Sequence, residues 1–433
     1  MKSVLHLCRR FFPQRGGSET YTGALIPALA SGAVKNRILA AGSPESDYAW
    51  SDLPVVRADD KVVQASNGRT RFYDRFVALL DEHRPDIVHW HFLPDEAEQM
   101  LNASIERKVR NVHTLHHPVT ICPRHDLIRF GREVCDRVPS KAACGPCMTH
   151  FRGLPASIST VFATASNLIP TSVKRHLPAS RIKTALTLAE DIGHWVQSQQ
   201  RCLARFDAHV VLSVASVKAL ERSGVDARRI RVSRLGTHHP SPAKTEWLNW
   251  HVAGRPMRVV FVGRLDQVKG VVALAEAAST FSASELQLDI YGMSGDADEK
   301  INELASTTGS PVRYLGHLND GDVVSRMSEY DFVAIPSQFF ETGPFTAVEA
   351  LQAGTPILAS NLPSLNEFML HGKNGWLVPP RLSTAWRDAL RTAIDEPDLA
   401  GAMRKDLSFS RSMQDVALEM LELYETVANT EIF

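Results

Sequence analysis

The sequence predicts an α/β protein made of two Rossmann-like domains. Short runs of β-branched and aliphatic residues alternate with helical segments in both halves of the chain. At 433 residues the chain is long enough for two domains of ordinary size, each with its own core. A polar, proline-containing stretch at 237–256 separates the two halves and is typical of an interdomain linker.

The first half carries six predicted strands, at 4–7, 38–41, 86–89, 111–115, 210–212 and 230–233. After the first strand, Gly16 and Gly17 precede a helix predicted over 19–29, with Ser18 as its N-terminal cap. Glycine lets a backbone approach a phosphate closely, although a glycine pair before a helix is also a common turn.

Histidines stand where two of these strands end. His116 and His117 follow the strand predicted at 111–115. His89 ends the strand predicted at 86–89 and His91 lies just after it. The two are either acceptor contacts or buried structural histidines, and we favour the second role. The first pair is either a site element or two histidines hydrogen-bonded in a loop.

The second half begins with a β-branched strand that ends at Gly263, and a helix begins near Gly270. Arg264 and Lys269 flank the turn between them, so we expect both to project into the crevice beyond the strand end, where open α/β sheets bind ligands. A guanidinium fork and an ammonium suit diphosphate oxygens. The alternative is that Arg264 and Lys269 are solvated turn residues with no role in ligand binding.

Two glutamates lie eight positions apart in residues 341–360. Glu341 is placed in the loop between a buried strand at 331–335 and a helix that follows Gly343, and Glu349 about two turns inside that helix. The helix N-terminus favours an anion such as a diphosphate. One carboxylate can accept hydrogen bonds from sugar hydroxyls and the other from a ribose, so the arrangement suits a nucleotide sugar.

Four of the six cysteines follow His116 closely: Cys122, Cys135, Cys144 and Cys147. Their spacing allows a structural zinc site that ties a loop lacking a core. Reduced structural thiols are an equal alternative, and disulfides or redox chemistry a lesser one in a reducing cytosol.

Charge and hydropathy exclude some functions. Lys and Arg (48) balance Asp and Glu (48), so we expect no nucleic-acid partner. A basic, partly apolar segment at 172–206 is either a solvated helical face or a contact with an anionic membrane surface. Without a signal peptide or a spanning run, the expected location is cytoplasmic, with the inner face of the cell membrane as the peripheral site.

Together these motifs resemble a retaining GT-B glycosyltransferase of glycosyltransferase family 4. The matching segments are FFPQRGGSET, TLHH, GRLDQVKG, the Glu341/Glu349 pair and FMLHGKNGWLVP, in the expected order along nearly the whole chain. The resemblance implies two Rossmann-like domains facing each other across a cleft. It implies an acceptor domain at 1–237 with a Cys-rich insertion at 118–150, a linker at 238–256, a donor domain at 257–412, and a helix at 413–433 that returns to the first domain.

The resemblance also implies residue roles. Glu341 would bind the donor sugar, Glu349 the ribose, and Arg264 with Lys269 the diphosphate, while His116 would lie beside the sugar. The remaining donor contacts it implies are Gly16, Gly17, Gly343, Pro344, Phe345 and Thr346. The family pattern often has an acidic residue after the histidine, and here that place is His117.

The implied reaction is transfer of a sugar from a nucleotide-diphosphate sugar to a glycan or lipid-linked glycan, in bacterial surface polysaccharide synthesis. Front-face attack is the usual proposal for this family, and its cationic pair replaces a catalytic metal. The alternatives are a degenerate nucleotide-sugar-binding scaffold and a nucleotide-sugar epimerase on the same fold.

Overall fold

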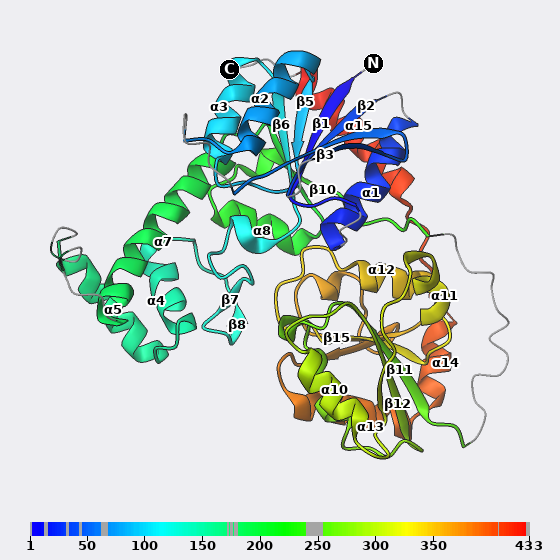
Figure 1. Ribbon diagram of the computed structural model, residues 1–433. Coiled ribbons are helices and arrows are strands. Elements are labelled where there is room, and N and C mark those ends of the chain that lie inside the picture. The colour runs from blue at the N-terminus through cyan, green and yellow to red at the C-terminus, as the bar shows by residue number, and fades with distance from the viewer. Residues whose placement is uncertain are drawn as a thin grey trace. The chain divides into compact units, whose positions relative to one another are not determined.

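The structure is a computed structural model that describes residues 2–12, 16–31, 34–42, 46–61, 68–170, 173, 176, 181–239, 254–405 and 407–429. The chain forms two compact units (Figure 1). Unit 1 combines Met1–Arg234 with Met413–Phe433, and unit 2 is Leu235–Ser412.

Unit 1 is built on an eight-stranded sheet in which only the pair β3–β4 is antiparallel. In sheet order the strands are β10 (Ile230–Val232), β9 (Ala208–Val211), β6 (Arg110–Leu115), β5 (Ile87–Trp90), β1 (Ser3–Cys8), β2 (Lys35–Ala41), β4 (Leu53–Ala58) and β3 (Ser46–Trp50). The chain moves outward from β1 to β2 on one side and later to β5 on the other. The strand order therefore reverses between β1 and β5, which is where doubly wound sheets bind ligands.

The helices of unit 1 are α1 (Gly17–Ala30), α2 (Arg71–His83), α3 (Ala97–Glu106), α4 (Lys141–Phe151), α5 (Ala156–Leu168), α7 (Arg181–Leu203), α8 (Val214–Arg222) and α15 (Met413–Asn429), with short turns η1 (Pro118–Thr120) and η2 (Ala227–Arg229). The parallel strands are buried along nearly their whole length, as strands covered on both faces must be. Leu5, Val88 and Trp90 share one core with Phe76 of α2 and Phe206.

Unit 2 carries six parallel strands in the order β13 (Val312–Tyr314), β12 (Leu286–Tyr291), β11 (Met257–Val262), β14 (Phe332–Ile335), β15 (Ile357–Ser360) and β16 (Gly375–Val378). This is the strand order of a dinucleotide-binding Rossmann sheet, with its reversal between β11 and β14. The remaining elements are α9 (Val271–Ala278), α10 (Asp298–Ser306), α11 (Val323–Met327), α12 (Phe345–Gln352), α13 (Ser383–Asp395), α14 (Asp398–Arg404), η3 (Gln267–Lys269), η4 (Asp320–Asp322) and η5 (Leu365–Glu367). Val259 and Phe261 of β11 share a core with Leu274 of α9 and Trp386 of α13.

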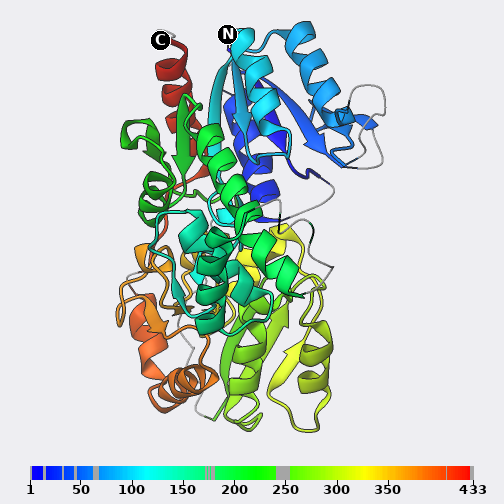
Figure 2. The same ribbon diagram turned by 90° about the vertical axis from the view of Figure 1, so that its left-hand side faces the viewer.

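The last helix belongs to the N-terminal unit, as the family resemblance implied. α15 packs against α1, and both views show it beside the strands of unit 1 (Figures 1 and 2). The Tyr424 hydroxyl lies 2.6 Å from His89 Nδ1, and Ser233 Oγ donates to Glu419 at 2.6 Å. The C-terminal segment therefore completes the core of unit 1.

The insertion after β6 has little regular structure. It contains η1, the two-stranded hairpin of β7 (Ile128–Arg129) and β8 (Glu133–Val134), and α4, whose N-cap Ser140 accepts from Ala143 N at 3.1 Å. α4 and α5 pack on α7, which also contacts α3. In the described part of the chain, no helix is long and apolar enough to cross a membrane.

Some expectations need correction. Ser18 does not cap α1, because the helix begins at Gly17 with Gly16 as its N-cap. Residues 235–237 lie in unit 2 instead of the first domain, since Thr237 N donates to Arg411 O at 2.9 Å. Residues 240–253 of the predicted linker fall outside the described residues.

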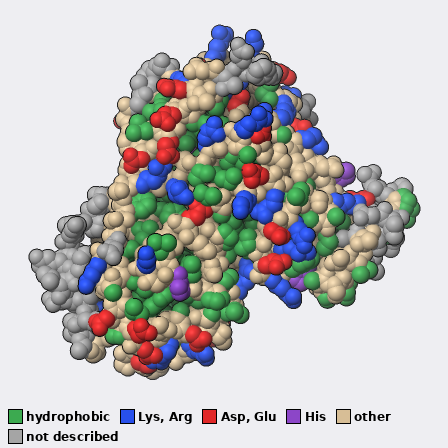
Figure 3. Space-filling view, turned by 180° about the vertical axis from the view of Figure 1, so that it is seen from behind, with side chains coloured by type: hydrophobic (Ala, Val, Ile, Leu, Met, Phe, Trp, Pro, Cys, Tyr) green, Lys and Arg blue, Asp and Glu red, His purple; other side chains and the backbone are tan. Residues whose placement is uncertain are grey.

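The face in Figure 3 carries Lys and Arg interspersed with Asp and Glu. The two signs are mixed there, in keeping with the balanced composition of the chain. Residues 172, 174–175 and 177–180 of the basic segment at 172–206 lie outside the described residues, and the side chains of Arg181 and Lys183 are not described.

Candidate functional site

Two loops meet at the reversal point of the unit 2 sheet. One runs from the end of β11 through η3 to α9, and the other from the end of β14 to α12. A Cβ on Gly270 would lie 1.8 Å from Pro336 O, so only glycine permits this approach of the loops. Gln338 N also donates to Val268 O at 2.8 Å. The sheet order and these contacts hold the two loops together as one site.

Lys269 and Glu341 come together across these loops. Lys269 Nζ donates to Glu341 Oε1 at 2.8 Å, and Ser337 Oγ donates to the same oxygen at 2.6 Å. The ammonium also lies 4.8 Å from the centre of the Phe339 ring. Glu341 is buried and Lys269 is partly exposed, so the carboxylate is held in place while the cation remains accessible.

Arg264 follows β11 as predicted, but its guanidinium pairs with Asp266 at 2.9 Å. Its side chain is half exposed. The structure therefore brings Lys269 and Glu341 together and gives Arg264 a different partner. Joint binding of a diphosphate by Arg264 and Lys269 stays a prediction.

Glu349 is the fifth residue of α12, closer to the helix start than the two turns that we expected, because α12 begins only at Phe345. His239 Nε2 lies 3.5 Å from Glu349 Oε1, and both side chains are largely buried. Gln352 Nε2 donates to His239 O at 2.7 Å. Sequence reasoning missed His239, since its segment reads only as a linker.

Pro344 is the N-cap of α12, and Phe345 and Thr346 form its first turn. The first amides of a helix have no partner within the helix, and the positive dipole end favours an anion. Phe345 also packs edge-on against His238. Gly343 immediately precedes this turn, so the predicted contacts at 343–346 lie at one helix N-terminus.

The predicted residues of unit 1 follow β1, β5 and β6, at and next to the reversal point of its own sheet. His116 follows β6 and is buried, and its Nε2 lies 3.0 Å from His91 Nδ1. Burial lowers the pKa of His116 to about 3, with a smaller effect from His117, so the ring is neutral at pH 7. His117 is exposed. His89 and His91 are buried, as the sequence analysis favoured.

Gly16 and Gly17 begin α1 after β1. A Cβ on Gly16 would lie 2.6 Å from Glu19 Oε2, so this buried carboxylate occupies the space beside Gly16. A Cβ on Gly17 would meet no heavy atom within 4 Å. A phosphate at Gly16 would have to displace Glu19, and the phosphate contacts of both glycines stay predictions.

The four cysteines of the insertion are free thiols. Burial raises the pKa of Cys122 and of Cys144 to about 11, and the other three thiols add to the effect at Cys144, so the four lie near one another. Phe130 N donates to Cys147 Sγ at 3.3 Å. Among the described residues, however, the group with three donor atoms within 4.8 Å of one another is His6, His89 and His91. The zinc site stays a prediction.

Comparison with known proteins agrees with this geometry. Residues 249–407 match the family described as Glycosyl transferases group 1, and residues 15–139 match Glycosyltransferase Family 4. The chain belongs to the GT-B glycosyltransferases of the family 4 type. The first match contains both loops of unit 2, and the second contains α1 and His116 of this glycosyltransferase.

Curated relatives match the glycosyltransferase over part of their length. D-inositol 3-phosphate glycosyltransferase of Corynebacterium urealyticum is 32% identical over 180 residues, which are 39% of this chain and 42% of the relative. Phosphatidyl-myo-inositol mannosyltransferase of Mycobacterium leprae is 31% identical over 220 residues, 47% and 58% of the two chains. The chain thus spans about half the length of the curated relatives it matches.

Solved structures are similar over the whole chain. Sucrose-phosphate synthase from Thermosynechococcus elongatus has a TM-score of 0.67 at 16% identity and covers 99% of both chains. Anabaena HepE in complex with UDP and glucose has a TM-score of 0.64 at 16% identity and covers 98% of this chain and 100% of its own. At such identities the likeness shows the GT-B fold.

Proposed function

We propose that this glycosyltransferase moves a sugar from a nucleotide-diphosphate sugar to a glycan or lipid-linked glycan, with retention of anomeric configuration. The observation that carries the proposal is the Lys269–Glu341 pair at the reversal point of unit 2. A cation for the diphosphate and a carboxylate for the sugar stand side by side where such a sheet binds nucleotides.

The donor is bound in three parts. Lys269 turns from Glu341 toward the diphosphate, and the half-exposed Arg264 leaves Asp266 for it. Glu341, held by Ser337, accepts hydrogen bonds from sugar hydroxyls. Glu349 accepts both ribose hydroxyls. A structural neighbour described with UDP-glucose supports UDP as the nucleotide.

The chemical step is a front-face displacement. The bond between the anomeric carbon and the diphosphate oxygen breaks, and the acceptor oxygen bonds to the same face of that carbon. The acceptor's proton passes to a phosphate oxygen, which gives a glycoside and a nucleoside diphosphate. Lys269, Arg264 and the amides of α12 stabilise the negative charge that develops on the leaving group, so no divalent metal is needed.

The surface of unit 1 supports a lipid-linked acceptor and a membrane location. Exposed apolar side chains occur at Phe151, Ile158 and Val161, at the end of α4 and along α5. Such residues suit contact with a lipid-linked glycan at a membrane surface. The name of one relative, a phosphatidyl-myo-inositol mannosyltransferase, contains a lipid, which supports a lipid-bearing acceptor here. Bacterial surface polysaccharide synthesis at the cytoplasmic membrane face is the corresponding role.

Two other functions remain to be distinguished by experiment. A degenerate scaffold would bind the nucleotide sugar without turnover. An epimerase on the same fold would convert the donor with no acceptor. NMR spectra of the donor, with and without an oligosaccharide acceptor, distinguish them: transfer gives a new glycoside of unchanged anomeric configuration.

The donor site is tested by thermal shift and calorimetry with UDP, GDP, ADP and TDP, each with EDTA present. One nucleotide should raise the melting temperature selectively, since a ligand at about 100 times its Kd stabilises by about 2.7 kcal/mol. Lys269→Gln should raise the Kd for that nucleotide roughly tenfold to a hundredfold, because the change removes a charge-assisted hydrogen bond.

The matched control is Lys300→Gln, a change of an exposed lysine on α10 of the same unit. It should leave nucleotide affinity unchanged. Equal affinity of a folded Lys269→Gln protein and the unaltered protein would remove Lys269 from the site. If no nucleotide binds to the folded protein, we would conclude that the chain has lost the ability to bind a donor.

A further inference from the structure

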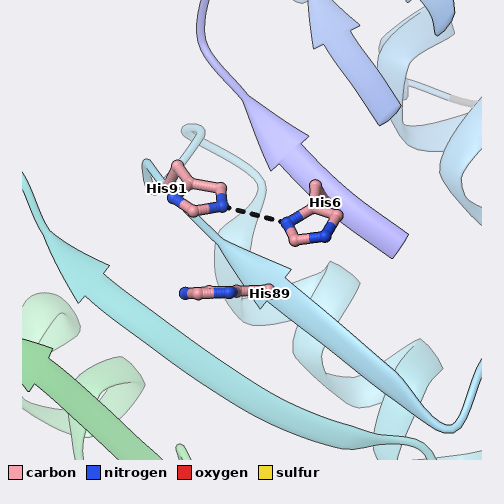
Figure 4. Close-up of side chains that lie close together, drawn as sticks. All are labelled: His6, His89 and His91. Atoms are coloured by element: carbon pink, nitrogen blue, oxygen red, sulfur yellow. Dashed lines mark hydrogen bonds between the residues drawn. The ribbon is translucent and has the colours of Figure 1, made fainter. Parts of the chain in front are cut away.

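A chain of hydrogen bonds leads from the interior of unit 1 to His116. His6 on β1 pairs in register with His89 on β5, and His91 follows β5. His6 Nε2 lies 3.1 Å from Asn36 Oδ1, and His6 Nδ1 lies 3.1 Å from His91 Nε2, the bond drawn in Figure 4. His91 Nδ1 then lies 3.0 Å from His116 Nε2. The four side chains are buried.

The direction of this chain is set at Asn36. Asn36 Nδ2 lies 3.4 Å from two carbonyl oxygens, Ile26 O and Val34 O, so it is the donor end of the amide. Asn36 Oδ1 is therefore the atom that faces His6, and an amide oxygen only accepts. The hydrogen of this bond must sit on His6 Nε2.

The remaining protons follow because a neutral imidazole carries one N–H. Burial lowers the pKa of His6 to about 4, and it lowers the pKa of His91 well below the ordinary value, so both rings are neutral at pH 7. His6 Nδ1 then accepts from His91 Nε2, and His91 Nδ1 accepts from His116 Nε2. His116 is left with an unprotonated Nδ1.

We propose that Asn36, His6 and His91 are positioning residues that hold His116 as the Nε2-protonated tautomer, so that its Nδ1 is a hydrogen-bond acceptor for a sugar hydroxyl. The identity of that hydroxyl rests on the proposed transferase function, whereas the tautomer does not. A ring with the opposite tautomer would offer a donor in the same place. The buried relay thus determines which kind of group His116 can receive.

The same histidines also form the cluster that could hold a metal. The donor atoms of His6, His89 and His91 lie within 4.8 Å of one another. His6 and His91 each use both ring nitrogens in the relay, and His89 lies 2.6 Å from Tyr424 Oη and 2.7 Å from Thr114 Oγ1. A metal ion would break these bonds, so the geometry favours the relay.

The tautomer is tested by NMR of protein labelled with ¹⁵N-histidine at pH 7.5, where long-range correlations tell which ring nitrogen is protonated. His116→Gln assigns the signal. His116 should be protonated at Nε2 in the unaltered protein. Asn36→Leu, which removes the terminal acceptor, should give a mixture of tautomers. Asn36→Asp keeps an acceptor there and should restore the single form.

Protonation of His116 at Nδ1, or an unchanged tautomer in folded Asn36→Leu, would overturn the relay. So would one equivalent of Zn²⁺ that binds tightly and perturbs the His6, His89 and His91 signals together.

The catalytic consequence is measured separately. Asn36→Leu should lower kcat for transfer in proportion to the fraction of His116 that leaves the Nε2-protonated form, about twofold for an equal mixture, because only that tautomer accepts from the sugar hydroxyl. Its Kd for the nucleoside diphosphate should stay unchanged, because the proposed nucleotide site lies in unit 2. An unchanged kcat would contradict the role of His116 as a hydrogen-bond acceptor for a sugar hydroxyl. If the unaltered protein transfers no sugar, the proposed function fails while the NMR result still decides the tautomer.

Discussion

Buried charged and polar side chains at the two candidate sites are paired with one another. Glu341 is almost fully buried, and Lys269 and Ser337 offset the cost of desolvating its carboxylate. His6 and His91 satisfy their ring nitrogens within the relay. Ligand binding in unit 2 must therefore exchange partners, whereas the unit 1 network can stay intact.

The buried histidines make unit 1 sensitive to acid. Burial is the main cause that lowers the pKa values of His6, His89, His91, His113, His116 and His209, and all six lie in unit 1. A histidine with a lowered folded pKa stays neutral, while the unfolded chain takes up a proton below about pH 6.5. Stability should therefore fall as pH drops below about 6.5, by up to about 1 kcal/mol per pH unit for each such histidine.

Urea denaturation at pH 7.5, 6.5 and 5.5 measures this dependence. The pKa of His209 is lowered to about 4, so this residue contributes to the pH dependence of the free energy of unfolding. His209→Gln should therefore make that dependence less steep. A pH-independent stability over this range would contradict the neutral, buried state of these rings.

At the scale of elements, each loop is held by a few specific contacts. η3 and the loop after β14 depend on Gly270, which has φ of 74° and lies against Pro336 O. The strand–Gly–helix pattern could be predicted from sequence. The pairing of two loops that are about seventy residues apart could not, since it follows from the β11–β14 adjacency in the sheet.

The cysteine insertion gives a prediction at this scale. The zinc hypothesis predicts about one zinc per chain in protein purified without chelator, held by Cys122, Cys135, Cys144 and Cys147. Removing it should lower the melting temperature and expose α4 to proteolysis, because a structural zinc contributes folding free energy to the segment that holds it. Elemental analysis and a chelator titration measure both effects.

Cys202 supplies the control, since it is buried in the main core of unit 1 and lies outside the insertion. Cys144→Ser should remove the zinc, and Cys202→Ser should retain it. A stable, zinc-free protein whose thiols alkylate slowly at pH 7 would instead support reduced structural thiols, because the pKa of Cys122 is raised to about 11 by burial.

At the scale of the whole molecule, the chain leaves unit 1, forms all of unit 2 and returns in α15. Unit 1 therefore depends on its two sequence ends at once. Both the helix at 413–433 and its place on the first domain were implied by the family resemblance. The partner of Tyr424 is decided by the fold, because His89 lies 335 positions away in sequence.

Tyr424→Ala should destabilise unit 1 by about 3–5 kcal/mol, the usual cost of removing a large buried aromatic side chain. Leu418, half exposed on the same helix, is the control, and Leu418→Ala should cost about 0.5 kcal/mol or less. Denaturant unfolding followed by circular dichroism measures both. Equal effects of the two changes would show that α15 does not complete the core.

The family was reached through the resemblance of motifs spread along the chain. The sequence by itself determined the α/β class, the two Rossmann-like halves, and the positions of Glu341, Lys269 and His116 in the loops after strands. These follow from local patterns, because hydrophobic period and turn residues act over a few positions. Only the tertiary structure decided that Lys269 meets Glu341, that His239 meets Glu349, and that Asn36 and His6 reach His116 through His91. Such contacts join segments far apart in the chain, and strand order, which no local pattern encodes, decides which of them become neighbours.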